Sequence, residues 1–117
     1  MPQLIAVGNK LYRVNPVKNS VDSSSGSNGA VWVSHRLGPS FGRPKDLLWF
    51  HNKLFLLTEK GIYQSRNECA DWGCTGSGWP VNNMVALMDG GQYMFGLTSD
   101  GRMWASNNEG ACWGCRG

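Results

Sequence analysis

Short apolar runs separated by polar turn residues recur along the whole chain, whereas apolar residues at helical spacing are nearly absent. The breaks contain Gly, Asn-Lys, Glu-Lys-Gly and Ser-Asp-Gly, which favour tight turns. This pattern predicts an all-β fold. The expected strands are Leu4–Val7, Leu11–Val14, Val31–His35, Leu47–Phe50, Leu54–Thr58, Ile62–Ser65, Val85–Met88, Tyr93–Thr98 and Met103–Ser106.

One hairpin pattern occurs three times. The stretch 55–65, with its Glu-Lys-Gly turn, aligns with 95–106 and its Ser-Asp-Gly-Arg turn, and 4–14 aligns as a further copy with a Gly-Asn-Lys turn. Self-similarity at a fixed period is the sequence signature of repeat architectures. The chain is therefore predicted to consist of repeated β units.

A second pattern, Ser-x-(Asp or Asn)-x-Gly-x-x-Trp, follows the hairpins. It runs from Ser65 to Trp72, with Cys69 at the glycine position, and from Ser106 to Trp113. A looser copy ends at Trp32, and the three tryptophans are 40 and 41 residues apart. The residues that match the pattern are Ser25, Ser27, Gly29, Trp32, Ser65, Asn67, Trp72, Ser106, Asn108, Gly110 and Trp113.

This motif resembles the Asp-box, or BNR repeat, of β-propeller blades such as those of sialidases and sortilin-type receptors. The resemblance implies about three antiparallel blades, approximately 1–40, 41–80 and 81–117, within one repeat domain. The Asn or Asp side chain is expected to accept hydrogen bonds from the amides of its own turn, and the glycine to supply a positive φ. The tryptophan is expected to cover the hairpin.

The phase of the repeats predicts incomplete blades. The Ser/Asn/Gly-rich stretch 15–29 is expected to be a long flexible loop, the first copy to lack an opening strand, and the third to stop soon after Trp113. Fewer than about four blades cannot close a ring. We therefore expect homo-oligomerisation or docking on a larger protein assembly, or else an open stack of sheets.

Composition and charge narrow the classes of partner. The chain has 117 residues, about one domain, and its 11 basic and 8 acidic residues are scattered, which gives no basic stripe for nucleic acid. No apolar stretch has the length of a membrane span, and no signal-peptide pattern opens the chain. A soluble protein is expected. Its cellular location stays open, and one alternative is that it forms part of a virion or other particle.

Four cysteines occur as Cys69 with Cys74 and as Cys112 with Cys115. Free or locally paired thiols, disulfides within each hairpin and a zinc site are the alternatives. Cys74 and Cys115 both follow Trp-Gly and so occupy equivalent positions in adjacent repeats. This separation disfavours zinc, and no metal or other cofactor is predicted.

Catalysis is not predicted. Glu68 and Glu109 occupy the same motif position in two repeats, which places them on separate loops rather than across one scissile bond. A binding module is favoured, in which Trp49, Trp79 and Tyr93, aromatics outside the motif, are candidates for a lectin-like glycan site. The alternative is a structural or assembly subunit of a phage or other particle, and a glycoside hydrolase fragment is the more distant one.

Overall fold

The computed structural model describes residues 3–24, 31–65 and 72–117, and nearly all of the regular structure in them is β-strand. Sheet 1 contains β1 (Leu4–Val7), β2 (Lys10–Asn15), β3 (Ser20–Ser24) and β4 (Val33–Arg36). Sheet 2 contains β5 (Pro44–Phe50), β6 (Lys53–Thr58), β7 (Ile62–Ser65) and β8 (Gly73–Gly76). Sheet 3 contains β9 (Met84–Gly90), β10 (Tyr93–Thr98), β11 (Met103–Ser106) and β12 (Gly114–Cys115).

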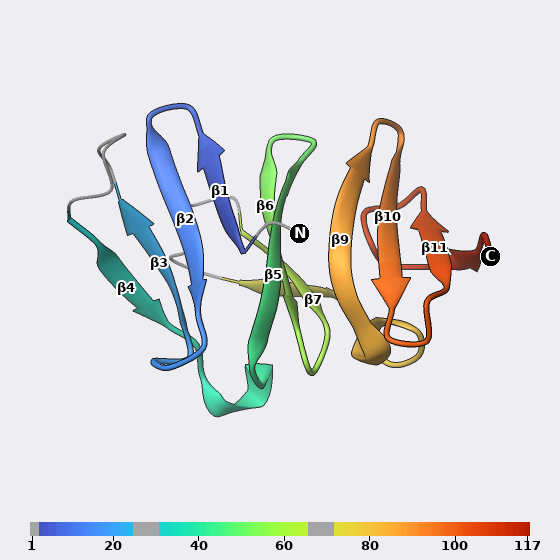
Figure 1. The fold of residues 1–117 in the computed structure, drawn as a ribbon, viewed down its shortest axis with the longest axis horizontal. Helices are drawn as coiled ribbons and strands as arrows, with labels where there is room; N and C mark the ends of the chain where they lie inside the picture. Colours follow the sequence, from blue (N-terminus) through green and yellow to red (C-terminus); the bar gives the residue numbers. More distant parts are fainter. Residues whose placement is uncertain (1–2, 25–30, 66–71) are drawn as a thin grey trace.

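The three sheets stand side by side in chain order, with sheet 2 between the other two (Figure 1). Every pair of neighbouring strands is antiparallel. Single 3-10 turns at Pro39–Phe41 and Val81–Asn83 lead from one sheet into the next. The prediction of an all-β fold with about three antiparallel blades is confirmed.

The prediction of a flexible loop over 15–29 is wrong at β3, which lies inside that stretch. The Asp22 side chain is buried and accepts hydrogen bonds from Ser20 Oγ at 2.7 Å, Asn15 Nδ2 at 3.0 Å and Arg13 Nε at 3.0 Å. Burial raises the pKa of Asp22, but hydrogen bonds from Asn15, Ser20, Arg13 and Ser34 outweigh it and lower the pKa to about 2. The strand was missed because its polar groups satisfy one another instead of following an apolar alternation.

The presence of β3 shifts the repeat alignment of the first copy by one strand. Leu11 on β2 pairs with Ser24, as Leu54 on β6 pairs with Ser65 and Met94 on β10 pairs with Ser106. The β1–β2 turn at 8–9 therefore corresponds to the β5–β6 turn at 51–52, and not to the β6–β7 turn as the sequence alignment suggested.

The expectation of incomplete blades is also wrong. Sheet 1 has its opening strand, β1, which pairs with β2 from Leu4 to Val7. Sheet 3 has its fourth strand, the short β12, which pairs with β11 through Trp104 and Ala105. Each sheet therefore has the four strands of a whole blade.

Two apolar clusters hold the sheets together. Sheets 1 and 2 share a cluster that contains Tyr12, Val21, Leu37, Leu47, Leu54 and Leu56, with Ile5, Val7, Val14, Phe41 and Trp72 packed against it. Sheets 2 and 3 share one that contains Leu48, Phe50, Phe55, Leu57, Ile62, Val81, Met84, Leu87, Met94 and Trp104, with Trp113 packed against it. Burial of these side chains is the main driving force that joins neighbouring sheets.

Candidate functional site

Each sheet has a forward face, which we define as the face toward the next sheet in chain order. Strand register identifies four equivalent positions on it, because paired residues of an antiparallel sheet point to the same side. They are Ile5, Tyr12, Val14 and Val21 in sheet 1, Leu48, Phe55, Leu57 and Ile62 in sheet 2, and Met88, Phe95, Leu97 and Met103 in sheet 3. All twelve are apolar, and in sheets 1 and 2 they pack into the two apolar clusters.

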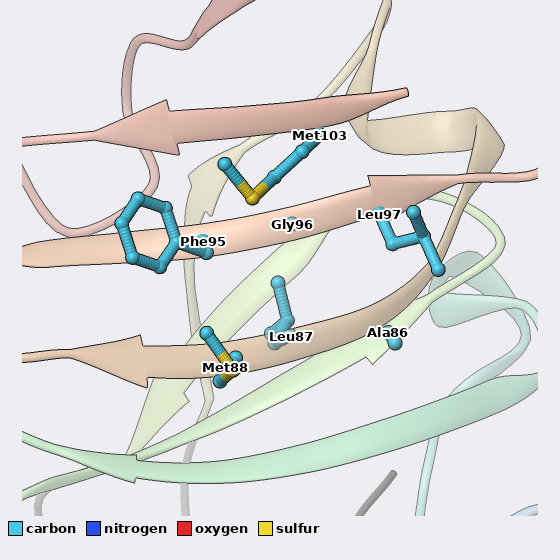
Figure 2. Close-up of a pocket in the computed structure, with 7 residues that line it drawn as sticks. All are labelled: Ala86, Leu87, Met88, Phe95, Gly96, Leu97 and Met103. Carbon is cyan, nitrogen blue, oxygen red and sulfur yellow. The ribbon is translucent and has the colours of Figure 1, made fainter. Parts of the chain in front are cut away.

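The forward face of sheet 3 is not covered by any described part of the chain. Met88 is 55% exposed, Leu97 38% and Met103 37%, whereas the equivalent Phe55, Leu57 and Ile62 of sheet 2 are fully buried. Figure 2 shows these side chains standing around Gly96 on β9, β10 and β11. They line an apolar hollow of about 310 Å³. Monomeric proteins rarely leave so many neighbouring apolar side chains exposed.

Each sheet also has a backward face, toward the preceding sheet. Leu47 and Leu54 of sheet 2 and Leu87 and Met94 of sheet 3 lie there, and all four are buried. The same positions in sheet 1 are Leu4, which is 60% exposed, and the half-buried Leu11.

The backward face of sheet 1 also carries a tryptophan. The Arg13 guanidinium lies 4.1 Å from the centre of the Trp32 ring. In sheet 3 the position of Arg13 is taken by Gly96, where an added Cβ would lie 3.3 Å from Trp113. The two tryptophans therefore stack over the same place on their own sheets, although Trp32 does so through a cation–π contact.

The loop Ser106–Trp113 is held by hydrogen bonds within itself. Ser106 Oγ accepts from the amide of Gly110 at 2.9 Å, and Asn108 Oδ1 accepts from the amide of Cys112 at 2.9 Å. Trp113 Nε1 donates to the carbonyl of Gly110 at 2.9 Å. Gly110 has φ +96°, a conformation that side chains rarely adopt.

The same loop contacts sheet 2. Glu109 forms an ion pair with Lys53 Nζ at 2.7 Å, and His51 Nδ1 lies 3.4 Å from its other oxygen. The hydrogen bond from Lys53 is the main cause that lowers the pKa of Glu109. The Thr75 hydroxyl donates to the Glu109 carbonyl at 2.8 Å, and Gly76 approaches the carbonyl of Gly110 so closely that a Cβ would not fit. The loop thus acts as a clasp between sheets 2 and 3.

The other motif residues are placed only in part. Ser25, Ser27, Gly29, Asn67, Glu68 and Cys69 lie outside the described residues. Ser65 is buried at the end of β7, and Trp72 is half-buried against the cluster between sheets 1 and 2. In sheet 1 the position of Ser65 and Ser106 belongs to Ser24, which is also buried.

The three aromatic glycan candidates lie in different surroundings. Trp49 lines a hollow of about 180 Å³ between sheets 1 and 2 together with Tyr12 and Asn52. Trp79 packs edge-on against Trp104, 5.8 Å between ring centres, and Tyr93 lies below the Arg116 guanidinium at 5.6 Å. Each of the three rings therefore has its own set of neighbours.

Cys74, Cys112 and Cys115 are exposed free thiols. Cys74 pairs with Tyr63 and Cys115 with Trp104, which are equivalent positions of sheets 2 and 3. Over residues 3–24, 31–65 and 72–117 no three His, Cys, Asp or Glu side chains gather where a metal ion could bind. In the same residues no helix has the length and apolar character needed to cross a membrane.

Sequence reasoning did not single out Met88, Leu97 and Met103, the residues of the uncovered face. The sequence did contain a sign of this face, because the alignment of the hairpins matches Leu97 to Leu57 and Met103 to Ile62. What the alignment could not show is that one set is covered and the other is not.

Comparison with known proteins supports the architecture. Similar solved structures include YCF48 from Cyanidioschyzon merolae, with a TM-score of 0.72, 14% identity, and coverage of 96% of this chain and 41% of that chain. PorZ, a surface component of the type-IX secretion system of Porphyromonas gingivalis, has a TM-score of 0.72 and 17% identity over 96% of this chain and 15% of that chain. An ancestral GH74 enzyme has a TM-score of 0.69 and 17% identity over 97% of this chain and 18% of that chain.

These likenesses establish the fold alone, and the chain spans less than half the length of each of the three structures. No curated protein matches the chain in sequence. The family model described as the DUF6242 beta propeller domain matches residues 2–115. The chain therefore belongs to the DUF6242 β-propeller domain family.

Proposed function

We propose that this chain is a non-catalytic assembly module that associates with a further β-sheet through the forward face of sheet 3. The observation that carries the proposal is the threefold repetition of that face. In sheets 1 and 2 the following sheet covers it, and in sheet 3 three of the four equivalent residues, Met88, Leu97 and Met103, are exposed. Burial of a Met, Leu or Phe side chain contributes about 1.5–3 kcal/mol, so covering this face is strongly favourable.

We also infer that Ser106–Trp113 is an Asp-box with a structural role. Its side chains bond to the amides of their own turn, and its outer edge binds Lys53 and Thr75 of the preceding sheet. The motif residues therefore fasten blades together rather than bind a ligand. A glycan site is not part of the proposal, because Trp49, Trp79 and Tyr93 lie in three different surroundings.

The proposal predicts self-association of the full chain that a charge on the forward face of sheet 3 abolishes. Light scattering after size exclusion, from micromolar to near-millimolar concentration, should give a mass above 12.9 kDa for the unmodified chain and 12.9 kDa for Met88→Glu. Val17→Glu is the matched control, because Val17 is 93% exposed in the β2–β3 turn.

Methionine oxidation supplies an independent measurement. If the face is covered in solution, Met88 and Met103 react with peroxide more slowly in the unmodified chain than in a Leu97→Glu variant. A chain that stays at 12.9 kDa throughout, with both methionines as reactive as those of an unfolded peptide, contradicts the proposed function.

A further inference from the structure

Resting on the proposed function, we propose which surface covers the forward face of sheet 3. It is the backward face of sheet 1 from a second copy of this chain. Two copies related by a twofold axis would then contact each other twice, sheet 3 on sheet 1 in both directions. The product is a closed ring of six sheets, within the usual range of about four to eight propeller blades.

The two free faces are the two halves of a joint that the chain builds twice internally. In each internal joint a forward face meets a backward face that carries a buried Leu on the first strand and a buried Leu or Met on the second. Sheet 1 keeps this pattern with Leu4 and Leu11, although no described residue of the preceding side covers them. A 60% exposed Leu4 is explained if a further sheet packs on it.

The lysine of the clasp is absent from the free forward face. Lys53 on β6 corresponds in register to Lys10 on β2 and to Tyr93 on β10. Lys53 forms the ion pair with Glu109 in the joint between sheets 2 and 3, and its counterpart at the rim of the free forward face is a tyrosine.

The polar pair on the backward face of sheet 1 does not oppose this contact. Asp22 is already fully buried and accepts three hydrogen bonds, so covering it adds little desolvation. Arg13 is bound to Asp22 and lies flat against Trp32. A paired, stacked guanidinium is the cationic group best suited to an interface.

The competing arrangement packs sheet 3 against sheet 3 of the second copy. It would bring two forward faces together, a combination that neither internal joint uses. It would also leave Leu4 and Leu11 exposed. The pattern of the chain therefore favours the head-to-tail joint.

The test is a complementation experiment with two single variants of the full chain, Met88→Glu in sheet 3 and Leu4→Glu in sheet 1. We expect the unmodified chain and the Val17→Glu control to have twice the mass of 12.9 kDa, and each interface variant alone to be monomeric. When the two variants are mixed, one joint combines an intact sheet 3 with an intact sheet 1. A 1:1 heterodimer should then form, and native mass spectrometry identifies it because the two chains differ in mass.

Each other outcome overturns the inference. If Met88→Glu is monomeric and Leu4→Glu still dimerises, the contact is sheet 3 on sheet 3, and the proposed assembly function survives. If mixing the two monomeric variants yields no heterodimer, the contact is not head-to-tail. If the unmodified chain is monomeric, both the inference and self-association fail. Circular dichroism of each variant checks that it is folded, and Leu4→Gln replaces Leu4→Glu if that variant unfolds.

Discussion

At the scale of single residues, Asp46 is a buried carboxyl group whose pKa is raised. It is fully buried on β5, where Oδ2 accepts a hydrogen bond from the amide of Leu87 at 2.9 Å. Burial raises the pKa of Asp46 to about 6, and the hydrogen bonds from the amides of Leu87 and Leu47 offset only part of that effect. Burial therefore favours the neutral carboxyl group, although the amide hydrogen bonds favour the carboxylate.

This shift predicts that stability falls as pH rises. Because the folded-state pKa lies above the unfolded value of about 3.9, the folded chain binds the proton more tightly. The contribution is fully present below about pH 4 and is lost as pH rises through about 6, with a total near 3 kcal/mol. Urea unfolding between pH 4 and 8 measures it. Asp46→Asn should flatten this slope, and an unchanged slope in that variant would show that another group is responsible.

Sequence reasoning reached some residues and not others for a physical reason. The hydrogen bonds of Asn108 and the positive φ of Gly110 belong to one short loop, so their roles were open to prediction from local chemistry. Asp46 could not be singled out, because its pKa depends on a strand that begins at Met84, far along the chain. Spacing from Trp32 pointed to Ser25 as the counterpart of Ser65 and Ser106. Strand register shows that the serine at their position in sheet 1 is Ser24.

At the scale of elements, the clasp loop adds polar contacts to the apolar cluster that joins sheet 3 to sheet 2. Its ion pair is partly buried, with the Lys53 side chain 18% and the Glu109 side chain 28% exposed. A short contact of this kind is shielded from solvent more than a surface pair, yet both charges keep some hydration.

We predict a coupling of about 1 kcal/mol between Lys53 and Glu109. Lys53→Met, Glu109→Gln and the double variant, each unfolded in urea at pH 7, form the cycle. The coupling should shrink as salt is added, because counterions screen partly exposed charges. Additive effects of the two substitutions would mean that the ion pair does not hold the clasp.

The strands with an apolar pattern were predicted, and the polar β3, the glycine-bounded β8 and the two-residue β12 were not. In β3 the side chains of Ser20 and Asp22 bond to each other and to β2. Strand formation there follows from a tertiary network that no local pattern reveals. Because β3 was missed, the first repeat was shifted by one strand, and because β12 was missed, the third repeat was expected to stop short.

At the scale of the whole molecule, the repeat alone was enough to predict the architecture. Three copies of a hairpin and motif indicate three units, since each unit has one apolar face that only a neighbour can cover. Which face stays uncovered depends on the packing of all three sheets. That information appears only when Phe55 and Leu57 are found buried and Leu97 exposed.

If the uncovered face joins copies of the chain, thermal stability depends on protein concentration. Association stabilises the folded state by mass action, so the midpoint of thermal unfolding should rise over a hundredfold increase in concentration. Differential scanning calorimetry measures this change, and Met88→Glu should show a midpoint independent of concentration. A constant midpoint in both chains would contradict association in the folded state.

The replacement of lysine by Tyr93 at the rim of sheet 3 has a consequence for temperature. A joint without an ion pair relies on apolar contact, and the hydrophobic driving force weakens on cooling. The internal joint between sheets 2 and 3, which also has the Lys53–Glu109 pair, is less sensitive to cold. Chilling a solution of rings should therefore release intact three-sheet chains before any sheet unfolds, and warming should restore the rings.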